Sequence, residues 1–596
     1  MKLKAILLAA MAAFMLPIAV LGDTHTSPNG KVKAETTRDA LVVSYKSDAG
    51  WQQIYKAYFQ GINGGSAEKM DIKYDMLVGK QSHIDKKAVK AAYSLQSGGL
   101  LVFIVTDDGV AFKKVSRAKA NYNGEEETTI DFSAATNYWI MKWSDGAEGF
   151  FPKNQATKLD DRWSIPALFE FPHNVFALIH EADVQHDQAA CSLYSTTDKG
   201  VYRIVTDKNE QFAQSSTWKT VMIGSLSDVV ESTLVTDVST PSKIQDTSWI
   251  QPGVAAWVYW AYNHGSNDYD IIKKYTDMAV ALKLPYVLID AEWDEMKNGK
   301  TVEDAVKYAV DNGIKPMIWY NSSVGWIDGA PGPKFRLNKP EDREKEFAWC
   351  EKIGVTGVKI DFFSGENNMN MAYCIDLLEC AAKHHLQVNF HGATVPRGWQ
   401  RTYPNLVSTE GVYGAEWYNN VPTFTKRAAA HNATLPFTRN VVGSMDYTPC
   451  AFTDSQHPHI TTHAHELALT ALYESGIQHL ADRPESFLAQ PKAVKDYLGC
   501  LPTAWDETRL LAGYPAEYVV MARRSGNTWY IACINGTDEA KDVTFSTDRL
   551  KGLGKKITLF ADSGKEKSPW AISKPAKMPA TISCQPRGGF LMVVNK

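Results

Sequence analysis

The chain has 596 residues, of which 44% are hydrophobic, 22% charged and 11% aromatic, and its formal net charge is −4. This composition is typical of a folded protein and excludes a disordered or collagen-like chain. The charge is balanced and lacks the basic stripe that a nucleic-acid partner requires, so we expect no nucleic acid to bind.

Residues 1–22 predict a signal peptide. Two lysines precede an apolar run from Ala5 to Leu21, and the run ends with small residues of the kind that signal peptidase accepts. A retained membrane anchor is the alternative, but the run is slightly shorter than the ~20 residues of a typical span. We therefore expect an exported protein, best suited to the bacterial periplasm, without a membrane span after cleavage.

Residues 23–245 predict an all-β N-terminal domain. Short alternating runs are separated by turn residues, as where Leu100–Val105 is followed by Asp107-Asp108-Gly109. Pro252 and Gly253 mark the change to the next domain.

Residues 246–512 alternate between short β-branched runs and helical stretches. Such alternation predicts a parallel sheet, and about eight units over ~250 residues predict a (β/α)8 TIM barrel. The expected strands are Ala255–Trp260, Tyr286–Asp290, Pro316–Tyr320, Gly357–Asp361, Val388–His391, Val407–Glu410 and Gln478–Ala481. The expected helices are Tyr269–Leu284, Val302–Asn312, Pro340–Ile353, Asn368–His385 and Thr461–Ser475.

Residues 513–596 return to strand patterns. Tyr518–Ala522 and Trp529–Ala532 flank a Ser-Gly-Asn turn, which predicts a hairpin. A C-terminal β-sandwich therefore follows the barrel.

Acidic residues end several of the predicted barrel strands. Asp290, Asp361 and Glu410 each stand at such an end, and Glu416 follows six residues after Glu410. One acid of this kind can simply cap a helix, but several at successive strand ends converge on the mouth where barrel enzymes place their active sites.

Asp361 and Glu416 suit the two roles of glycoside cleavage, which needs one ionised and one protonated carboxyl group. Lys359 lies two positions before Asp361, so both side chains point the same way on a strand, and its charge favours the ionised carboxylate. A plain ion pair at the barrel rim is the alternative. Glu416 lies among aromatic residues that favour its protonated form.

Several motifs resemble glycoside hydrolase family 97, found as exported enzymes in Bacteroides-type bacteria. They span nearly the whole mature chain and are Asp246–Trp249, Val358–Phe362, His391–Ala393 with Arg397-Gly398, Arg401–Asn405, Thr434–Arg439, Met445–Pro449 and His479–Pro484. The resemblance implies an N-terminal β-super-sandwich, a (β/α)8 barrel and a C-terminal β-sandwich. It also implies a calcium-dependent, exo-acting α-glycosidase.

The family contains an inverting and a retaining branch. Inverting members carry a glutamate base after the histidine of the fifth strand, where this chain has Gly392. Retaining members carry an aspartate nucleophile at the end of the fourth strand, where Asp361 stands. The chain therefore resembles the retaining, α-galactosidase-like branch, with Asp361 as nucleophile and Glu416 as general acid/base.

The resemblance also points to Ca²⁺ ligands, namely Glu181, Glu410 and Glu416. Glu181 would tie the N-terminal domain to the barrel mouth. The residues after it depart from the family pattern, since His186-Asp187-Gln188 stands where a Tyr-Pro-Gly-like turn is expected. If Glu416 contacts the ion, we expect one oxygen to bind it and the other to serve the substrate.

Five further residues are predicted substrate contacts because they fall at or just beyond strand ends. Asp290 and Lys359 are preferred, since fixed hydrogen bonds reject an epimer that lacks the matching hydroxyl. The five are Asp290, Trp293, Asn321, Lys359 and His391.

The main reading is a retaining exo-α-galactosidase that acts on oligosaccharides or polysaccharide-derived α-glycosides. A β-L-arabinopyranosidase using the same machinery is the nearest alternative, because its substrate differs only by lacking the C6 hydroxymethyl group. An alternative of another class is a non-catalytic carbohydrate-binding protein, in which the barrel is a relic.

Overall fold

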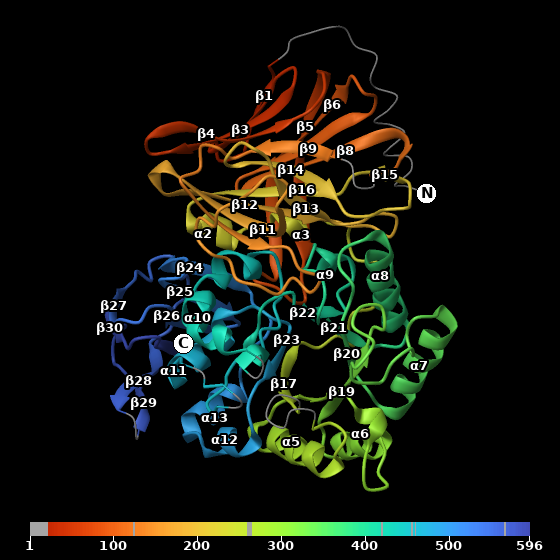
Figure 1. The fold of residues 1–596 in the computed structure, drawn as a ribbon. Helices are drawn as coiled ribbons and strands as arrows, with labels where there is room; N and C mark the ends of the chain where they lie inside the picture. Colours follow the sequence, from red (N-terminus) through yellow and green to blue (C-terminus); the bar gives the residue numbers. More distant parts are fainter. Residues whose placement is uncertain are drawn as a thin grey trace.

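A computed structural model describes residues 22–122, 126–258, 265–418, 421–454, 457–458, 460–565 and 568–596. The N-terminal β domain lies at the top of Figure 1, the barrel lies below it, and the C-terminal sheet packs beside the barrel. The predicted signal peptide falls outside the described residues except for Gly22. Among the helices of the described residues, none is long and apolar enough to cross a membrane.

The N-terminal domain is built on one antiparallel 16-stranded sheet. In β2 and β14 every second residue is buried, which is the period of a strand with one face in the core. Helices α2 (Leu226–Glu231) and α3 (Leu234–Asp237) lead out of the domain. The strands are β1 (Thr24–Thr26), β2 (Val32–Thr36), β3 (Ala40–Ser47), β4 (Gly50–Tyr58), β5 (Ile62–Asp75), β6 (His83–Leu95), β7 (Leu100–Thr106), β8 (Gly109–Ala120), β9 (Glu126–Asp131), β10 (Asn137–Lys142), β11 (Arg162–Phe171), β12 (Val175–Ala182), β13 (Cys191–Ser195), β14 (Val201–Thr206), β15 (Ala213–Ser215) and β16 (Trp218–Gly224).

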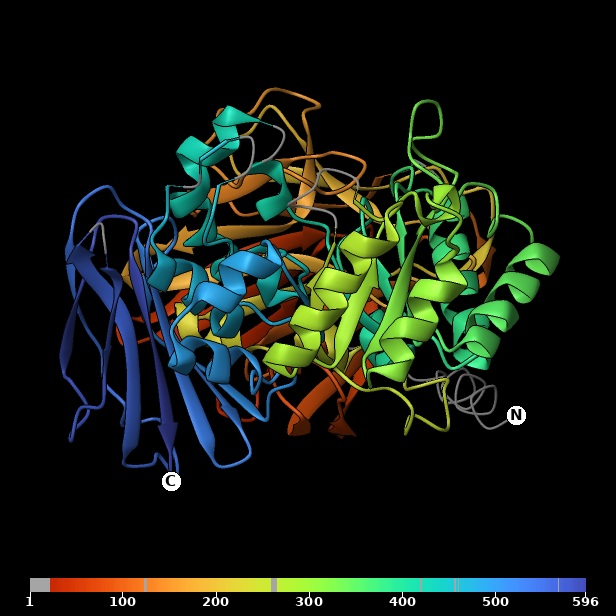
Figure 2. The same cartoon turned by 90° about the horizontal axis from the view of Figure 1, so that it is seen from below.

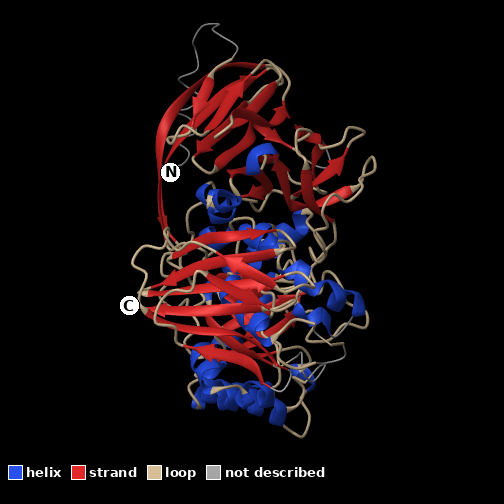
Figure 3. Cartoon of the chain, turned by 90° about the vertical axis from the view of Figure 1, so that its left-hand side faces the viewer, coloured by secondary structure: helices blue, strands red, loops and turns tan. Residues whose placement is uncertain are grey.

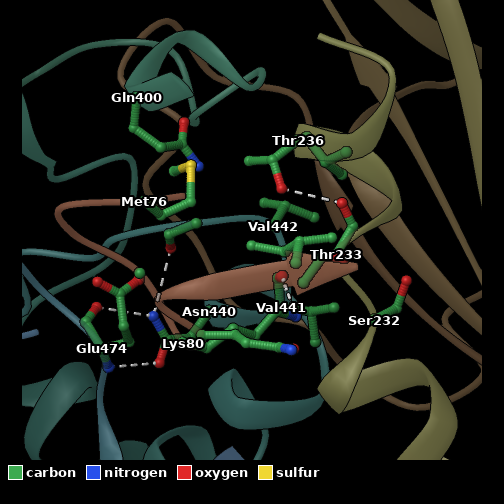
Figure 4. Close-up of a pocket in the computed structure, with 15 residues that line it drawn as sticks. Met76, Lys80, Ser232, Thr233, Thr236, Gln400, Asn440, Val441, Val442 and Glu474 are labelled. Carbon is green, nitrogen blue, oxygen red and sulfur yellow. Dashed lines mark hydrogen bonds between the residues drawn. The ribbon is translucent and has the colours of Figure 1, made fainter. Parts of the chain in front are cut away.

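The turn between β5 and β6 links all three domains. The Nζ atom of Lys80 donates to the carbonyl of Val230 at 2.7 Å and to that of Val441, in the barrel, at 2.9 Å. The backbone carbonyl of Lys80 accepts from Thr508 of the C-terminal domain at 2.8 Å. Lys80 lines a cavity of about 30 Å³ between the N-terminal domain and the barrel (Figure 4).

The barrel strands are parallel and buried on both faces, which explains their nearly continuous apolar sequences. The helices wrap the outside of this sheet (Figure 2). The strands are β17 (Gly253–Trp257), β18 (Tyr286–Ile289), β19 (Lys315–Asn321), β20 (Gly357–Asp361), β21 (Gln387–Phe390), β22 (Leu406–Thr409) and β23 (Ile477–Leu480). The helices are α5 (Tyr269–Leu282), α6 (Val302–Asp311), α7 (Pro340–Ile353), α8 (Asn368–Lys383), α9 (Trp399–Thr402), α10 (Pro422–Asn432), α11 (His463–Leu472), α12 (Pro484–Ala489) and α13 (Lys492–Leu498).

The predicted barrel is therefore confirmed, with one irregular position. Residues 444–449 occupy the place between β22 and β23 but form no regular strand. The amide of Asp446 donates to the carbonyl of Thr409 at 3.1 Å, and the amide of Ala481 donates to that of Pro449 at 3.1 Å. These bonds bring the two edge strands together around the barrel and direct Asp446 to its interior. Of the predicted strand Ala255–Trp260, residues 259–260 lie outside the described residues.

The C-terminal domain is a six-stranded sheet packed with a two-stranded one (Figure 3). Its first strand, β24, begins at Glu507, six residues before the predicted domain start at residue 513, and pairs along its length with β25. A bulge between Leu510 and Ala512 interrupts the alternation that would have marked this strand in the sequence. The strands are β24 (Glu507–Tyr514), β25 (Tyr518–Ser525), β26 (Thr528–Asn535), β27 (Lys541–Thr544), β28 (Lys556–Lys565), β29 (Ser568–Ser573), β30 (Thr581–Cys584) and β31 (Gly589–Asn595).

Candidate active site

The predicted catalytic residues lie at the C-terminal ends of the barrel strands. Asp361 is the last residue of β20, and Lys359 lies two positions before it on the same side of the strand. Glu410 directly follows β22, and Glu416 lies in the short helix η3 (Ala415–Tyr418). In this fold class that end of the barrel carries the active site.

Lys359 and Asp290 form a buried ion pair next to Asp361. The Nζ atom of Lys359 lies 3.0 Å from Oδ2 of Asp290 and 3.8 Å from Oδ2 of Asp361. The indole N–H of Trp257 donates to the same Oδ2 of Asp290 at 2.8 Å. Burial raises the pKa of Asp290, but Lys359 and the hydrogen bonds outweigh it, so the pKa lies below its ordinary value. The pair therefore stays charged.

Both carboxylate oxygens of Asp361 are held in place. Oδ1 accepts from the amide of Phe362 at 2.8 Å, and Oδ2 accepts from the indole N–H of Trp319 at 3.1 Å. The pKa of Asp361 is raised above its ordinary value, because burial outweighs the opposing charges of Lys359 and His391. Two hydrogen bonds from rigid strand and loop positions thus fix the orientation that a nucleophile needs.

Gly392 lies directly against this carboxylate. A Cβ atom on Gly392 would stand 3.0 Å from Oδ1 of Asp361 and 2.9 Å from the amide nitrogen of Phe362. The residue also has a left-handed backbone with φ of +47°, which glycine adopts without steric cost. The space for a side chain at position 392 is therefore taken by the carboxylate of Asp361.

His391 joins Glu410 to the barrel interior. Its Nδ1 lies 3.2 Å from Oε1 of Glu410, and its Nε2 lies 2.7 Å from Oδ2 of Asp446. His479 contacts the same Oδ2 at 2.7 Å. Burial alone would lower the pKa of His391, but Glu410 and Asp446 raise it well above its ordinary value. Both ring nitrogens of this predicted substrate contact are thus engaged by carboxylates.

Three carboxyl groups gather at the barrel mouth. Ligand atoms of His391, Glu410 and Glu416 lie within 4.8 Å of one another. Glu148, from the loop after β10, accepts from the indole N–H of Trp417 at 2.9 Å. Burial and the charge of Glu410 raise the pKa values of Glu148 and Glu416 well above the ordinary value of a glutamic acid. The pKa of Glu410 is lowered instead, because His391 outweighs its burial.

Glu181 forms hydrogen bonds with Arg397, Cys191 and Thr217. Its Oε2 accepts from Arg397 at 2.7 Å and from the amide of Cys191 at 3.0 Å, while Oε1 accepts from the hydroxyl of Thr217. Among the described residues, the group of ligand atoms at the barrel mouth consists of His391, Glu410 and Glu416 and includes neither Glu181 nor Glu148. A carboxylate paired with a guanidinium and two further donors has the contacts of a structural ion pair, and its role as a calcium ligand stays a prediction.

Two other predicted substrate contacts form hydrogen bonds with backbone atoms. The indole N–H of Trp293 donates to the carbonyl of Trp319 at 2.6 Å, and the ring is buried. Asn321 donates to the carbonyl of Trp326 at 3.2 Å and accepts from the amide of Ser323 at 2.7 Å. Asn321 therefore fixes the loop that follows β19.

Sequence reasoning missed Glu148 and Trp319. Glu148 lies in Gly146-Ala147-Glu148-Gly149. An acidic residue between glycines in an all-β domain was the sequence feature that could have marked it as a functional residue. A Cβ on Gly146 would lie 3.4 Å from the Cα of Gly392, which shows how closely this loop approaches the barrel.

The arrangement suits cleavage of a glycosidic bond. The pKa of Glu416 is raised well above its ordinary value, whereas that of Asp361, which lies close to Lys359, is raised less. Glycoside hydrolysis needs such a pair in opposite protonation states.

Comparison with known proteins agrees with this chemistry. Family models match "Glycosyl-hydrolase 97 N-terminal" at residues 26–241, "Glycoside hydrolase 97" at 249–412 and "Glycosyl-hydrolase 97 C-terminal, oligomerisation" at 504–595. A "Probable retaining alpha-galactosidase" of Streptomyces bingchenggensis is 36% identical over 479 residues, covering 77% of this chain and 72% of the relative. A "Retaining alpha-galactosidase" of Bacteroides thetaiotaomicron is 28% identical over 566 residues, covering 83% of each chain.

Solved structures extend the comparison to the fold. The crystal structure of a beta-arabinopyranosidase superposes with a TM-score of 0.83 at 26% identity, covering 96% of this chain and all of the other. A family 97 enzyme variant from Pseudoalteromonas sp. strain K8 gives a TM-score of 0.81 at 21% identity over the same shares. Three domains in the same order, matched along the chain and carrying a carboxyl-rich barrel mouth, establish that the chain is a glycoside hydrolase and belongs to glycoside hydrolase family 97.

Proposed function

We propose that the chain is a retaining, exo-acting α-galactosidase in which Asp361 is the nucleophile and Glu416 the general acid/base. The relatives named retaining α-galactosidases support this assignment. So does the position of Asp361 at a strand end, where both of its oxygens are anchored.

The reaction proceeds by two displacements. A carboxylate oxygen of Asp361 bonds to the anomeric carbon, the bond from that carbon to the leaving oxygen breaks, and Glu416 gives its proton to the leaving oxygen. Water then gives a proton to the carboxylate of Glu416 and attacks the anomeric carbon, which releases Asp361. Two inversions leave the product in the α configuration.

One observation carries the choice of the retaining mechanism. The carboxylate of Asp361 fills the space that a side chain at position 392 would need, with 3.0 Å between Oδ1 and the added Cβ. A side chain at position 392 would therefore crowd the carboxylate of Asp361, and the chain has glycine there.

Calcium is part of the proposal, with Glu148, Glu410 and Glu416 as its ligands. Ca²⁺ prefers several carboxylate oxygens, and this donor set fits that preference. The charge of Glu410 raises the pKa of both other groups, so a divalent cation there would relieve the repulsion. When bound, Ca²⁺ would supply positive charge near the leaving oxygen. Glu410, ion-paired to His391, would hold it, and one oxygen of Glu416 would stay with the substrate.

Lys359 and Asp290 are proposed to set the sugar specificity. Their charged side chains lie next to Asp361, where sugar hydroxyls would meet a fixed donor and a fixed acceptor. A β-L-arabinopyranosidase remains a second candidate, and the structural likeness to an enzyme of that name supports it. Export to the periplasm is likewise proposed from the N-terminal sequence.

Two measurements test the function. Nitrophenyl α-D-galactoside and β-L-arabinopyranoside are compared by kcat/KM, and we expect the galactoside to be preferred. NMR then follows the first sugar released, which we expect to be the α anomer. The Asp361→Asn variant serves as the control and should be inactive, which also excludes a protein that only binds sugars. A β-anomeric first product would contradict the mechanism, and a preference for the arabinopyranoside would favour the second candidate.

A further inference from the structure

Trp326 is a large exposed aromatic residue in the loop that follows β19. Its side chain is 52% exposed, although it lies on the same end of the barrel as the catalytic residues. Its indole N–H donates to the carbonyl of Asp328 at 2.8 Å, which turns the polar edge of the ring back into its own loop. The ring therefore presents an exposed aromatic face next to Phe362, the residue that directly follows Asp361.

A short series of ring contacts connects Trp326 to Asp361. The ring of Trp326 meets that of Phe362 edge to face, with 5.0 Å between centroids. Phe362 meets Trp319 at 5.7 Å, and Trp319 donates its N–H to the carboxylate of Asp361. Only two ring contacts therefore separate Trp326 from the side chain that donates a hydrogen bond to the nucleophile.

The loop that carries Trp326 is held firmly. Asn321 donates to the carbonyls of Trp326 and Pro331, at 3.2 and 3.4 Å. Lys334 donates to two further carbonyls of the loop, those of Ile327 and Ala330. A binding surface that is already ordered loses little conformational entropy when a ligand arrives.

Trp326 also borders a cleft whose lining suits a sugar. The cleft has a volume of about 430 Å³ and is formed by the loops that follow β18 and β19. Carboxylate and ammonium groups suited to hydroxyls stand beside the ring, and a flat aromatic face suits the apolar side of a pyranose. Among the lining residues are Glu292, Asp294, Glu295, Trp326 and Lys334.

We propose that Trp326 and this cleft form a subsite for the sugar on the leaving-group side of the substrate. The inference rests on the proposed function and deepens it, because it makes an oligosaccharide, rather than a galactoside of a small alcohol, the preferred substrate class. The galactosyl unit occupies the site at Asp361, and the next sugar rests on the exposed face of Trp326.

The test compares two substrates that differ in the leaving group. α-Galactosyl fluoride has no leaving-group sugar, whereas an α-1,6-linked galactosyl-glucose disaccharide has one. We expect Trp326→Ala to lower kcat/KM for the disaccharide about tenfold and to leave that for the fluoride within about twofold. Trp326→Phe should restore most of the loss. Trp51→Ala removes another exposed tryptophan, 43% exposed in β4 of the N-terminal domain, and should change neither substrate.

Each outcome is decisive. Equal losses on both substrates would overturn the subsite, because Trp326 would then act on the galactosyl site through Phe362. If Trp326→Ala keeps the wild-type kcat/KM on both substrates, the subsite is overturned as well. A wild-type enzyme that releases galactose from neither substrate would refute the proposed function, and the galactoside subsite with it. Thermal unfolding of each variant verifies that the fold is intact.

Discussion

At the scale of single residues, the reaction depends on how Asp361 is placed. Hydrogen bonds from Phe362 and Trp319 fix its two oxygens, and Gly392 leaves room for one of them. Lys359 stands close to the carboxylate while remaining paired with Asp290. Small changes at any of these positions would move the proposed nucleophile relative to the anomeric carbon, and rates are sensitive to such shifts.

Gly392→Ala tests this placement. Its Cβ would lie 3.0 Å from Oδ1 of Asp361, and a displacement of a few tenths of an ångström should lower kcat several-fold. The left-handed backbone adds a stability cost of about 1–2 kcal/mol. Gly526→Ala is the matched control, since Gly526 also has a left-handed φ, of +56°, but lies in a hairpin turn of the C-terminal domain with open space around it. A Gly392→Ala enzyme with nearly wild-type kcat would show that a Cβ atom at position 392 does not displace the carboxylate of Asp361.

The residue scale also shows what sequence patterns reveal. Asp361, Glu410 and Lys359 could be predicted because a strand end in a barrel fixes where a side chain points. Trp293 and Asn321 occupy similar positions but hydrogen-bond to backbone atoms, and local sequence does not distinguish the two uses.

At the scale of elements, the loop after β10 completes the barrel mouth. It brings Glu148 to Glu410 and Glu416 from more than 250 residues away in the sequence. Such a long-range approach has no periodic signature in the sequence, and the expectation for Glu181 came from the family resemblance. The irregular residues 444–449 escaped prediction for a related reason, since no alternation marks them.

Glu148→Gln is expected to weaken calcium binding. Replacing a carboxylate ligand by an amide lowers the ligand charge, so the calcium concentration for half-maximal activity should rise about tenfold or more. Titration of the chelator-treated enzyme with Ca²⁺ measures this. Activity that stays unchanged after chelation would show that the enzyme does not need calcium.

Glu181→Gln should act on stability instead. It leaves the buried guanidinium of Arg397 with less compensating charge, and we expect a loss of about 3 kcal/mol in the free energy of unfolding. The calcium midpoint should stay at the wild-type value. A large shift of that midpoint with unchanged stability would return Glu181 to the metal site.

At the scale of the whole molecule, the turn between β5 and β6 connects the three domains through Lys80. The domain order could be predicted from sequence, because each domain has its own periodicity. The contact between domains could not, because it depends on one partly buried lysine and three partners distant in sequence. Burial, with the nearby charges of Arg523 and Lys86, lowers the pKa of Lys80 to about 7.

This lowered pKa predicts a dependence of stability on pH. Between pH 7 and the ordinary lysine pKa, the unfolded chain binds a proton at Lys80 that the folded chain has lost, so this residue favours folding more as pH rises. The free energy of unfolding of the wild type, measured relative to Lys80→Met, should increase by about 2 kcal/mol from pH 7 to pH 9. Denaturant unfolding at both values tests this, and a constant difference would show that Lys80 titrates normally.

The most direct measurement of the central claim is covalent trapping. The wild-type enzyme is incubated with a slowly hydrolysed fluorinated galactosyl substrate, digested and analysed by mass spectrometry. We predict a single glycosylated peptide with the label on Asp361, and no label in Asp361→Asn. A label on another residue, or an active enzyme that acquires none, would contradict the account.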